Sequence, residues 1–533
     1  MTPILRRSWF PVAAAICVGT PAYIYYRFWQ ERQQQTFTLA VKEKTVDGKM
    51  QRVERRFPLI PANEVEKRIR ENSSFESHTR PSGLTWKHTT AFLASNDPIE
   101  DANSNQIIQR DDSDPSAPGD YLFFAVMDGH AGYHTSRLLS RVLIDAVVLE
   151  LAQLTKAPGP MGRLDWIKSF IQSPSSQSSI MLSPERVTSS LQNAFTKLDT
   201  ELLNAPLRVL ANNIDQESRK NKAIPDLSKH PLALSTMLPS LSGSCAIMAL
   251  FDTANRDLYV ACTGDSRAVA GIWEPMGRDQ GQWRIEVLSE DQTGRNLEEK
   301  KRMQSEHPPD EADYVIREGR VLGGLEPTRA FGDARYKWPR PIQETLNQAF
   351  MIGNNKPMRP PPALFKTPPY VTARPVVSHR KLSFPGDADT PQKEGAVRFV
   401  VLATDGLWDE LTNEEVVALV GGHFAGLKGK VPRSKLLSLV PTTTGAQGVE
   451  GKNKKDTNTI GHWAFEDDNL SAHLIRNAFG GGDEAKLRKL LSIPAPHSRR
   501  YRDDITVTVV WWEEGDERNA KVASITEQAK AKL

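Results

Sequence analysis

Carboxylate side chains in this sequence stand repeatedly at the ends of apolar runs. The stretch YLFFAVMDGH places Asp128, Gly129 and His130 directly after one such run, and VVLATDGLWD places Asp405 after another. An ionised carboxylate at the end of a buried strand is costly unless its charge is paired. Six acidic residues occupy such positions or adjoining turns: Glu100, Asp101, Asp128, Asp265, Asp405 and Asp503.

A cluster of these carboxylates would need a cation, because close negative charges repel one another. Hard carboxylate oxygens select Mg²⁺ or Mn²⁺ over zinc or copper. Gly129, which follows Asp128, lets the backbone approach an ion closely and leaves its carbonyl oxygen free as a ligand. The pattern therefore predicts that strand ends distant in the sequence converge on divalent cations.

The elements that would position these residues alternate between apolar strands and amphipathic helices. Two of the strands, 244–252 and 257–271, are separated by only four residues, which predicts a hairpin. Hairpins with helices in separate blocks predict an α+β fold with antiparallel sheets. The predicted strands are 121–128, 244–252, 257–271, 397–405 and 505–512, and the predicted helices are 133–154, 185–204, 295–306, 412–420 and 469–479.

Composition excludes several classes of protein. The 533 residues are 39% hydrophobic and 25% charged, which is close to the globular average. With 68 basic and 65 acidic residues, the net charge of +3 gives no electrostatic case for nucleic acid binding. Three cysteines cannot form a disulfide framework, and Cys245 and Cys262 lie in apolar runs where buried thiols are expected.

The first 30 residues differ from the rest of the chain. They contain Arg6, Arg7 and Arg27 and no acidic residue, as mitochondrial targeting segments do. The apolar stretch 9–26 has the minimum length of a membrane-spanning helix, so a retained inner-membrane anchor is the alternative to a cleaved targeting segment. A secretory signal is disfavoured because no clear small-residue cleavage site follows the apolar run.

We expect five regions along the chain. Residues 1–35 form the targeting segment or anchor, 36–81 a linker, and 82–515 the folded domain. Two polar stretches, 339–395 and 426–468, are interpreted as surface insertions that are mobile or wrap the core. Residues 516–533 form a polar tail.

Six motifs carry a family resemblance. In chain order they read DGHAG, SGSCA, TGDSRAV, TRAFGD, LATDGLWD and RDDIT. Motifs of this kind, in this order, resemble the type-2C protein phosphatases, which are metal-dependent serine/threonine phosphatases built as a β-sandwich flanked by helices. The resemblance covers roughly 82–512, and LASNDPIED, RAFGDARYKW and YRDDITV resemble the pyruvate dehydrogenase phosphatase branch.

The resemblance implies roles for the acidic residues. Asp128 would bridge two Mg²⁺ or Mn²⁺ ions, with the Gly129 carbonyl on one of them, and Asp405 and Asp503 would complete the ligands of the other. Glu100 and Asp101 would orient water or ligate directly. Asp265 would hold a weaker third ion, with a plain turn aspartate as the alternative.

The resemblance also implies the chemistry. A water activated by two divalent ions would hydrolyse phosphoserine or phosphothreonine, and His130 would protonate the leaving oxygen as general acid. Most family members bind the substrate phosphate with an arginine at the position of Asn96, so another base must compensate. Arg329 is the candidate, whereas Thr328 and Asp333 are interpreted as structural or on the substrate side.

Three functions remain in competition. The leading hypothesis is a mitochondrial protein phosphatase whose phosphoprotein substrate is the pyruvate dehydrogenase complex. A catalytically silent relative that acts as a regulator or scaffold is disfavoured, because Asp128, Asp405 and Asp503 are all present. A two-metal nuclease or polymerase is disfavoured because it would need a basic surface.

Overall fold

The computed structural model describes residues 35–44, 50–80, 83–109, 119–154, 183–214, 216–221, 223–277, 280–384, 396–444 and 460–514. The predicted targeting or anchor segment, including 9–26, and the tail at 516–533 lie outside the described residues. Among the helices that the structure describes, none combines the length and apolarity needed to cross a membrane.

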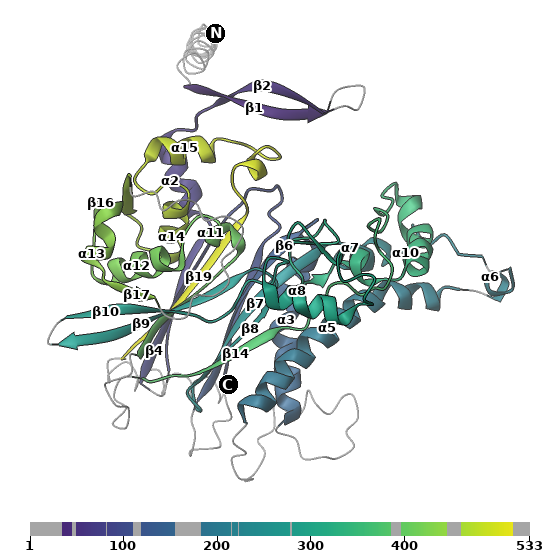
Figure 1. The fold of residues 1–533 in the computed structure, drawn as a ribbon, viewed down its shortest axis with the longest axis horizontal. Helices are drawn as coiled ribbons and strands as arrows, with labels where there is room; N and C mark the ends of the chain where they lie inside the picture. The colour runs from purple at the N-terminus through teal and green to yellow at the C-terminus, as the bar shows by residue number, and fades with distance from the viewer. Residues whose placement is uncertain are drawn as a thin grey trace, which may run out of the picture.

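Two large β-sheets form the centre of the protein (Figure 1). The seven-stranded sheet runs in the order β17 (Thr442–Thr444), β10 (Gln280–Val287), β9 (Arg267–Gly277), β15 (Ala396–Ala403), β19 (Ile505–Glu514), β4 (Leu84–Leu93) and β3 (Ser73–Thr79). The six-stranded sheet runs in the order β14 (Val376–Lys381), β8 (Asp257–Thr263), β7 (Gly243–Asp252), β6 (Asp120–His130) and β5 (Ala102–Gln109), and β13 (Phe331–Gly332) pairs with β7. All pairs are antiparallel except β10 with β17.

The facing sides of the sheets form one apolar core. Trp86 of β4 lies at ring-centroid distances of 5.1 Å from Phe251 of β7 and 4.9 Å from Trp512 of β19. Every residue of β7 and β8 is buried. Strands covered on both faces read as continuous apolar runs, which is why these segments were recognisable in the sequence.

Helices cover the outer faces of both sheets (Figure 1). The seven-stranded sheet is covered by α2 (Ala62–Arg70), α11 (Asp405–Trp408), α12 (Asn413–Phe424), α14 (Leu470–Ala478) and α15 (Glu484–Leu491). The six-stranded sheet is covered by α3 (His134–Leu154) and α5 (Pro184–Asn212). The predicted α+β sandwich flanked by helices on both sides is confirmed.

The remaining short elements lie around this sandwich. They are α6 (Gln216–Asn221), α7 (Ala233–Leu241), α8 (Leu297–Glu306), α9 (Ala334–Lys337), α10 (Arg340–Leu346), α13 (Leu436–Leu439), β11 (Ile316–Arg317), β12 (Arg320–Val321), β16 (Gly429–Pro432), β18 (His462–Phe465) and the turns η1 (Asn347–Met351), η2 (Ile352–Asn354), η3 (Arg433–Lys435) and η4 (Ser498–Arg500). Local sequence motifs explain where two of the larger helices begin. Thr412 and Glu415 form a capping box at α12, and Pro184 occupies the first turn of α5.

One predicted strand is wrong. The stretch 257–271 is two strands, β8 and β9, which belong to different sheets. The chain crosses between the sheets at Gly264, whose φ of +111° is available to glycine at little cost. The crossing places Asp265 in the turn between the sheets, where both sheets end.

The predicted linker at 36–81 also differs from the structure. It forms a hairpin of β1 (Thr36–Lys44) and β2 (Met50–Pro58), then α2, then β3, which is the edge strand of the seven-stranded sheet. Within the predicted insertions, β14, β16, β17 and β18 pair with other strands. In the sequence these strands resemble loops, because edge strands carry charged and polar residues.

Candidate active site

Three of the predicted carboxylates meet where the sheets end. One oxygen each from Asp128, Asp265 and Asp405 lies within 4.8 Å of the other two. Asp128 comes from the C-terminal end of strand β6, Asp265 from the β8–β9 turn, and Asp405 from the start of α11, just after β15. Residues that are 277 positions apart in the sequence (128 to 405) therefore form one acidic cluster.

This cluster is electrostatically strained without a cation. Burial raises the pKa of Asp128 well above its ordinary value, and the nearby charges of Asp405, Asp101 and Asp265 raise it further. Burial and then the Asp405 charge raise the pKa of Asp503 to about 6. Carboxylates with raised pKa values are those that a bound divalent cation would keep ionised. The donor set is all oxygen, which fits Mg²⁺ or Mn²⁺.

Two glycines of the motifs allow the backbone to pack closely beside the cluster. A Cβ atom on Gly129 would lie 2.0 Å from the carbonyl oxygen of Glu100, and one on Gly406 would lie 2.1 Å from the carbonyl oxygen of Asp504. Any other residue at either position would collide with that carbonyl oxygen unless the backbone moved. Glycine after aspartate is therefore required here for packing against the acidic segments.

Asp101 is close to the cluster and anchored by hydroxyl groups. Its Oδ2 accepts hydrogen bonds from Thr404 Oγ1 at 3.0 Å and from Thr506 Oγ1 at 2.9 Å. Burial, followed by the charge of Asp504, raises its pKa well above the usual value. These contacts join the segment after β15 to β19 at the edge of the site.

Glu100 contacts the loop after β6 and the guanidinium group of Arg499. Its Oε1 accepts a hydrogen bond from the backbone N–H of Gly132 at 2.6 Å, and its Oε2 lies 3.1 Å from Arg499. The neighbouring Asp504 holds the same segment from the other side, because it accepts from the backbone N–H groups of Asn96 at 2.9 Å and of Glu100 at 2.9 Å. Asp504 is therefore a structural clamp on the 95–100 loop.

His130 pairs with a residue that the sequence did not assign to it. Its Nε2 lies 2.6 Å from Oδ2 of Asp333. Burial alone would lower the pKa of His130, but the Asp333 carboxylate raises it above the ordinary value. The pairing of β13 with β7 brings the two residues together, because Gly332 stands opposite Gly243. Asp333, for which a structural and a substrate-side role were both open, therefore lies beside His130.

Gly243 of the SGSCA motif makes this pair possible. A Cβ atom there would lie 2.0 Å from Nε2 of His130 and 2.4 Å from Oδ2 of Asp333. Any larger residue would push the imidazole and the carboxylate apart. The motif glycine is therefore a steric requirement of the His130–Asp333 pair.

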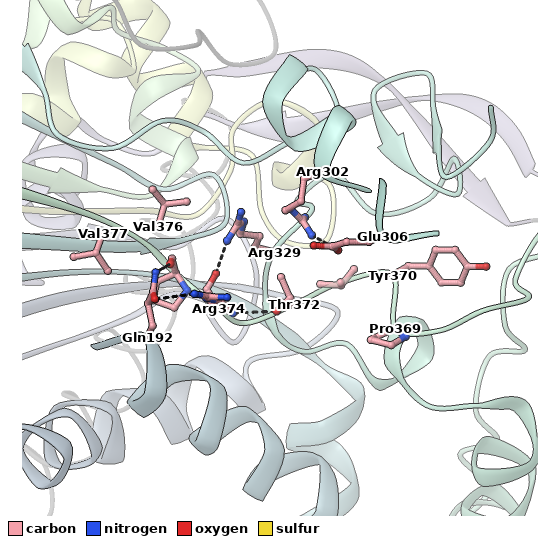
Figure 2. Close-up of a pocket in the computed structure, with 12 residues that line it drawn as sticks. Gln192, Arg302, Glu306, Arg329, Pro369, Tyr370, Thr372, Arg374, Val376 and Val377 are labelled. Atoms are coloured by element: carbon pink, nitrogen blue, oxygen red, sulfur yellow. Dashed lines mark hydrogen bonds and ion pairs between the residues drawn. The ribbon is translucent and has the colours of Figure 1, made fainter. Parts of the chain in front are cut away.

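Arg329 lines a cavity that contains none of the residues of the acidic cluster. It borders a cavity of about 550 Å³ between α5, α8 and the segment before β14 (Figure 2). None of the six predicted carboxylates is among the residues that line this cavity. The hypothesis that Arg329 replaces the missing phosphate-binding arginine is therefore not supported by its position.

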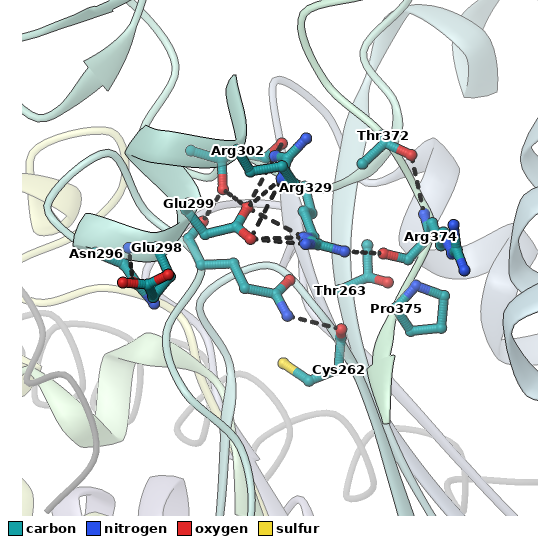
Figure 3. A network of polar contacts seen from close by, with 12 residues as sticks. Cys262, Thr263, Asn296, Glu298, Glu299, Arg302, Arg329, Thr372, Arg374 and Pro375 are labelled. Carbon is teal, nitrogen blue, oxygen red and sulfur yellow. Dashed lines mark hydrogen bonds and ion pairs between the residues drawn. The ribbon is translucent and has the colours of Figure 1, made fainter. Parts of the chain in front are cut away.

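The contacts of Arg329 explain what it does instead (Figure 3). Its guanidinium donates to Glu299 at 2.7 Å and to the carbonyl oxygen of Arg374 at 2.7 Å. Thr328 also donates to Glu299, at 2.6 Å. Burial would raise the pKa of Glu299, but hydrogen bonds from Arg329 and Arg302 lower it to about 2. The network is a structural ion pair that joins α8 to the TRAFGD segment.

The cation beside the acidic cluster is Arg499, which the sequence reasoning missed. It lies on η4, with its Nη1 3.1 Å from Glu100 and 3.6 Å from Asp503. Burial would lower the pKa of Arg499, but the charges of Asp503, Glu100, Asp504 and Asp128 raise it. Its side chain remains 44% exposed, so it can reach a ligand in solvent. In the sequence, the position of Arg499 four residues before Asp503 is the feature that could have pointed to a role in the site.

The chain is similar to known phosphatases over most of its length. A family model described as protein phosphatase 2C matches residues 181–426. A protein phosphatase 2C homolog of Schizosaccharomyces pombe is 37% identical over 422 residues, which are 79% of this chain and 79% of that protein. The mitochondrial pyruvate dehydrogenase (acetyl-transferring) phosphatase 1 of Saccharomyces cerevisiae is 33% identical over 488 residues, which are 87% of this chain and 75% of that protein.

A human relative extends the comparison. The mitochondrial pyruvate dehydrogenase (acetyl-transferring) phosphatase 2 is 30% identical over 453 residues, which are 79% of this chain and 76% of that protein. The chain belongs to the protein phosphatase 2C family. It is a type-2C serine/threonine protein phosphatase, and its substrates are phosphoproteins.

Proposed function

We propose that this protein is a Mg²⁺- or Mn²⁺-dependent phosphatase of mitochondria that dephosphorylates and activates pyruvate dehydrogenase. The observation that carries the catalytic part is the meeting of Asp128, Asp265 and Asp405 within 4.8 Å. The relatives named as mitochondrial pyruvate dehydrogenase phosphatases support the substrate and the location. The basic, acid-poor segment at 1–30 also supports the location.

The metal ligands in this proposal are Asp128, Asp405 and Asp503, with the carbonyl oxygen of Gly129. Asp265 would hold a third ion, and Glu100 and Asp101 would hold the surrounding segments. When bound, divalent ions supply positive charge against the phosphate oxygens and lower the pKa of water.

His130 acts as general acid. It would donate its Nε2 proton to the leaving serine or threonine oxygen, which is a poor leaving group as an alkoxide. General acid catalysis of this kind contributes about 10²–10⁴ in rate. Asp333, 2.6 Å from His130 Nε2, orients the ring and stabilises its protonated form. Asp333 contacts the same nitrogen that donates the proton. Its carboxylate must therefore move away from Nε2 so that the substrate oxygen can accept the proton.

Arg499 binds the substrate phosphate in place of the arginine that is absent at position 96. The side chain of Asn96 is uncharged, and its Nδ2 donates to Asp504 at 2.8 Å. Arg499 contacts Glu100, which also accepts from Asn96 Nδ2 at 3.4 Å, so the two residues border the same carboxylate. A guanidinium there can offer a phosphate group two parallel hydrogen bonds.

The test is a phosphatase assay with purified full-length protein. The substrates are phosphorylated pyruvate dehydrogenase and an unrelated phosphoserine protein of similar size, each with and without Mg²⁺ or Mn²⁺. We expect metal-dependent release of phosphate, with a higher kcat/KM on pyruvate dehydrogenase. Equal rates on both proteins would contradict the substrate, and no release from either would support the silent regulator instead.

Membrane association is a separate part of the proposal. We propose that residues 9–26 anchor the protein to the inner mitochondrial membrane. Extraction of isolated mitochondria with alkaline carbonate tests this, because it leaves membrane-spanning proteins in the pellet. Recovery of the whole protein in the supernatant would refute the anchor and leave the catalytic proposal unaffected.

A further inference from the structure

A second cluster of metal-binding side chains lies on the edge of the seven-stranded sheet. β3 and β4 pair in a register that places Glu76 opposite His88 and Ser77 opposite Lys87. His78 is two residues from Glu76 on β3, so it projects from the same face of the sheet. Two imidazoles and one carboxylate therefore share one face of a two-strand ladder.

The side chains are close enough to share one ion. Single ligand atoms of Glu76, His78 and His88 all lie within 4.8 Å of one another. His78 Nε2 is 3.2 Å from Glu76 Oε2, and His88 Nε2 is 3.8 Å from Glu76 Oε1. In a tetrahedral zinc site with bonds of about 2.1 Å, neighbouring ligand atoms stand about 3.4 Å apart. The two measured separations lie on either side of that value.

His88 is buried although one of its ring nitrogens makes no hydrogen bond to any residue that the structure describes. The residue is 3% exposed, and within the described part of the chain its Nε2 has no hydrogen-bond partner. A buried polar atom without a partner is unfavourable, because it has lost its hydrogen bonds to water. Nε2 is the atom that points to Glu76, while the ring packs edge-on against Phe124 at a centroid distance of 5.0 Å.

The charge on Glu76 faces the two imidazoles of this cluster. Among the residues that the structure describes, its ion-pair partners are His78 and His88. Burial lowers the pKa of His88, although the Glu76 charge opposes this effect. A neutral imidazole cannot neutralise a carboxylate, but it is the form that ligates a metal.

We propose that Glu76, His78 and His88 form a Zn²⁺ site that is separate from the catalytic cluster. Imidazole nitrogen with one carboxylate suits zinc and does not suit Mg²⁺, which prefers oxygen ligands. Three protein ligands leave a fourth position for water, and Glu76 and His78 are 43% and 40% exposed, so the site is open to solvent. The ion cross-links edge strand β3 to β4 and stabilises the end of the sheet.

The experiment uses the full-length protein after removal of metals with a chelator. Excess Mg²⁺ is added first to fill the aspartate cluster, and Zn²⁺ is then titrated by calorimetry. Co²⁺ is used in parallel, because its visible absorption reports tetrahedral nitrogen and oxygen ligation. We expect one equivalent of Zn²⁺ per chain and a rise in Tm on Zn²⁺ addition.

The variants His78→Ala and Glu76→Gln test the ligands, since both side chains are partly exposed and their loss should not prevent folding. We expect each to weaken Zn²⁺ binding at least tenfold and to abolish the Co²⁺ spectrum and the rise in Tm. His462→Ala, which removes an exposed histidine of another sheet, is the matched control and should bind as wild type does. Wild-type affinity in both ligand variants, or no Zn²⁺ binding in the presence of Mg²⁺, would overturn the proposal. Phosphatase activity with Mg²⁺ is measured on the same samples, so failure of the zinc site is distinguishable from failure of the catalytic one.

Discussion

Replacement of Arg499 by alanine tests how this enzyme binds phosphate without an arginine at position 96. Arg499 lies 3.1 Å from Glu100 and 3.6 Å from Asp503, and its side chain is 44% exposed. A hydrogen bond to a charged group contributes about 1.5–3 kcal/mol. Because solvent screens a half-exposed charge, we take the lower end of this range, which corresponds to about a tenfold loss of kcat/KM.

The loss should fall mainly on KM. Arg499 would contact the phosphate in both the ground state and the transition state, and the removal of such uniform binding raises KM more than it lowers kcat. The assay is steady-state hydrolysis of a phosphopeptide at saturating Mn²⁺, so that any weakened metal binding does not limit the rate. Inhibition by inorganic phosphate should weaken in parallel.

Two further variants make the test specific. Asn96→Arg should restore part of the activity of the Arg499→Ala protein, because position 96 borders the same carboxylate, Glu100. Arg500→Ala removes a neighbouring exposed arginine and should leave KM unchanged. Wild-type KM and phosphate inhibition in Arg499→Ala, with no effect of Asn96→Arg, would refute the reasoning.

Four other changes have defined outcomes. Asp128→Asn should abolish phosphopeptide hydrolysis while circular dichroism shows a folded domain, because it removes a charge that the cations need. His130→Ala should lower the rate more on a phosphopeptide than on p-nitrophenyl phosphate, whose leaving oxygen needs no proton. Gly243→Ala should reduce kcat in the same leaving-group-dependent way, since its Cβ atom would separate His130 from its carboxylate partner. Glu299→Gln should destabilise the protein by about 2–3 kcal/mol at neutral pH, as measured by urea unfolding. The pKa of Glu299 is lowered from 4.5 to about 2, so its stabilisation is complete above pH 4.5 and is lost as pH falls toward 2. The difference from wild type should therefore shrink over that interval.

Each outcome can be contradicted. Undiminished turnover by Asp128→Asn would refute its role as a ligand. Equal losses on the two substrates would exclude His130 as the general acid, and wild-type kinetics in Gly243→Ala would show that the imidazole position tolerates a methyl group. A stability difference for Glu299→Gln that does not change between pH 4.5 and pH 2 would show that its ionisation is not what stabilises the network.

The sequence located those site residues whose position is marked by a local sequence pattern. The ends of apolar runs located Asp128 and Asp405, and the structure brings both together with Asp265. The same reasoning could not identify the neighbours of Asp333 and Arg329, because these are set by contacts between remote segments. Asp333 meets a histidine 203 positions away, and Arg329 is held by a glutamate 30 positions away.

The main strands and helices and the acidic ends of the strands could be predicted from the sequence, because burial on both faces imposes apolar runs that stand out in the chain. The sandwich arrangement followed from the family resemblance of the motifs. The contacts between polar side chains, in contrast, depend on the tertiary structure and could not be predicted from the sequence. The β13–β7 pairing placed Asp333 beside His130, and the β3–β4 register gathered Glu76, His78 and His88. Strand register is fixed by the packing of whole sheets, and a shift of one residue would move each of these side chains to the opposite face.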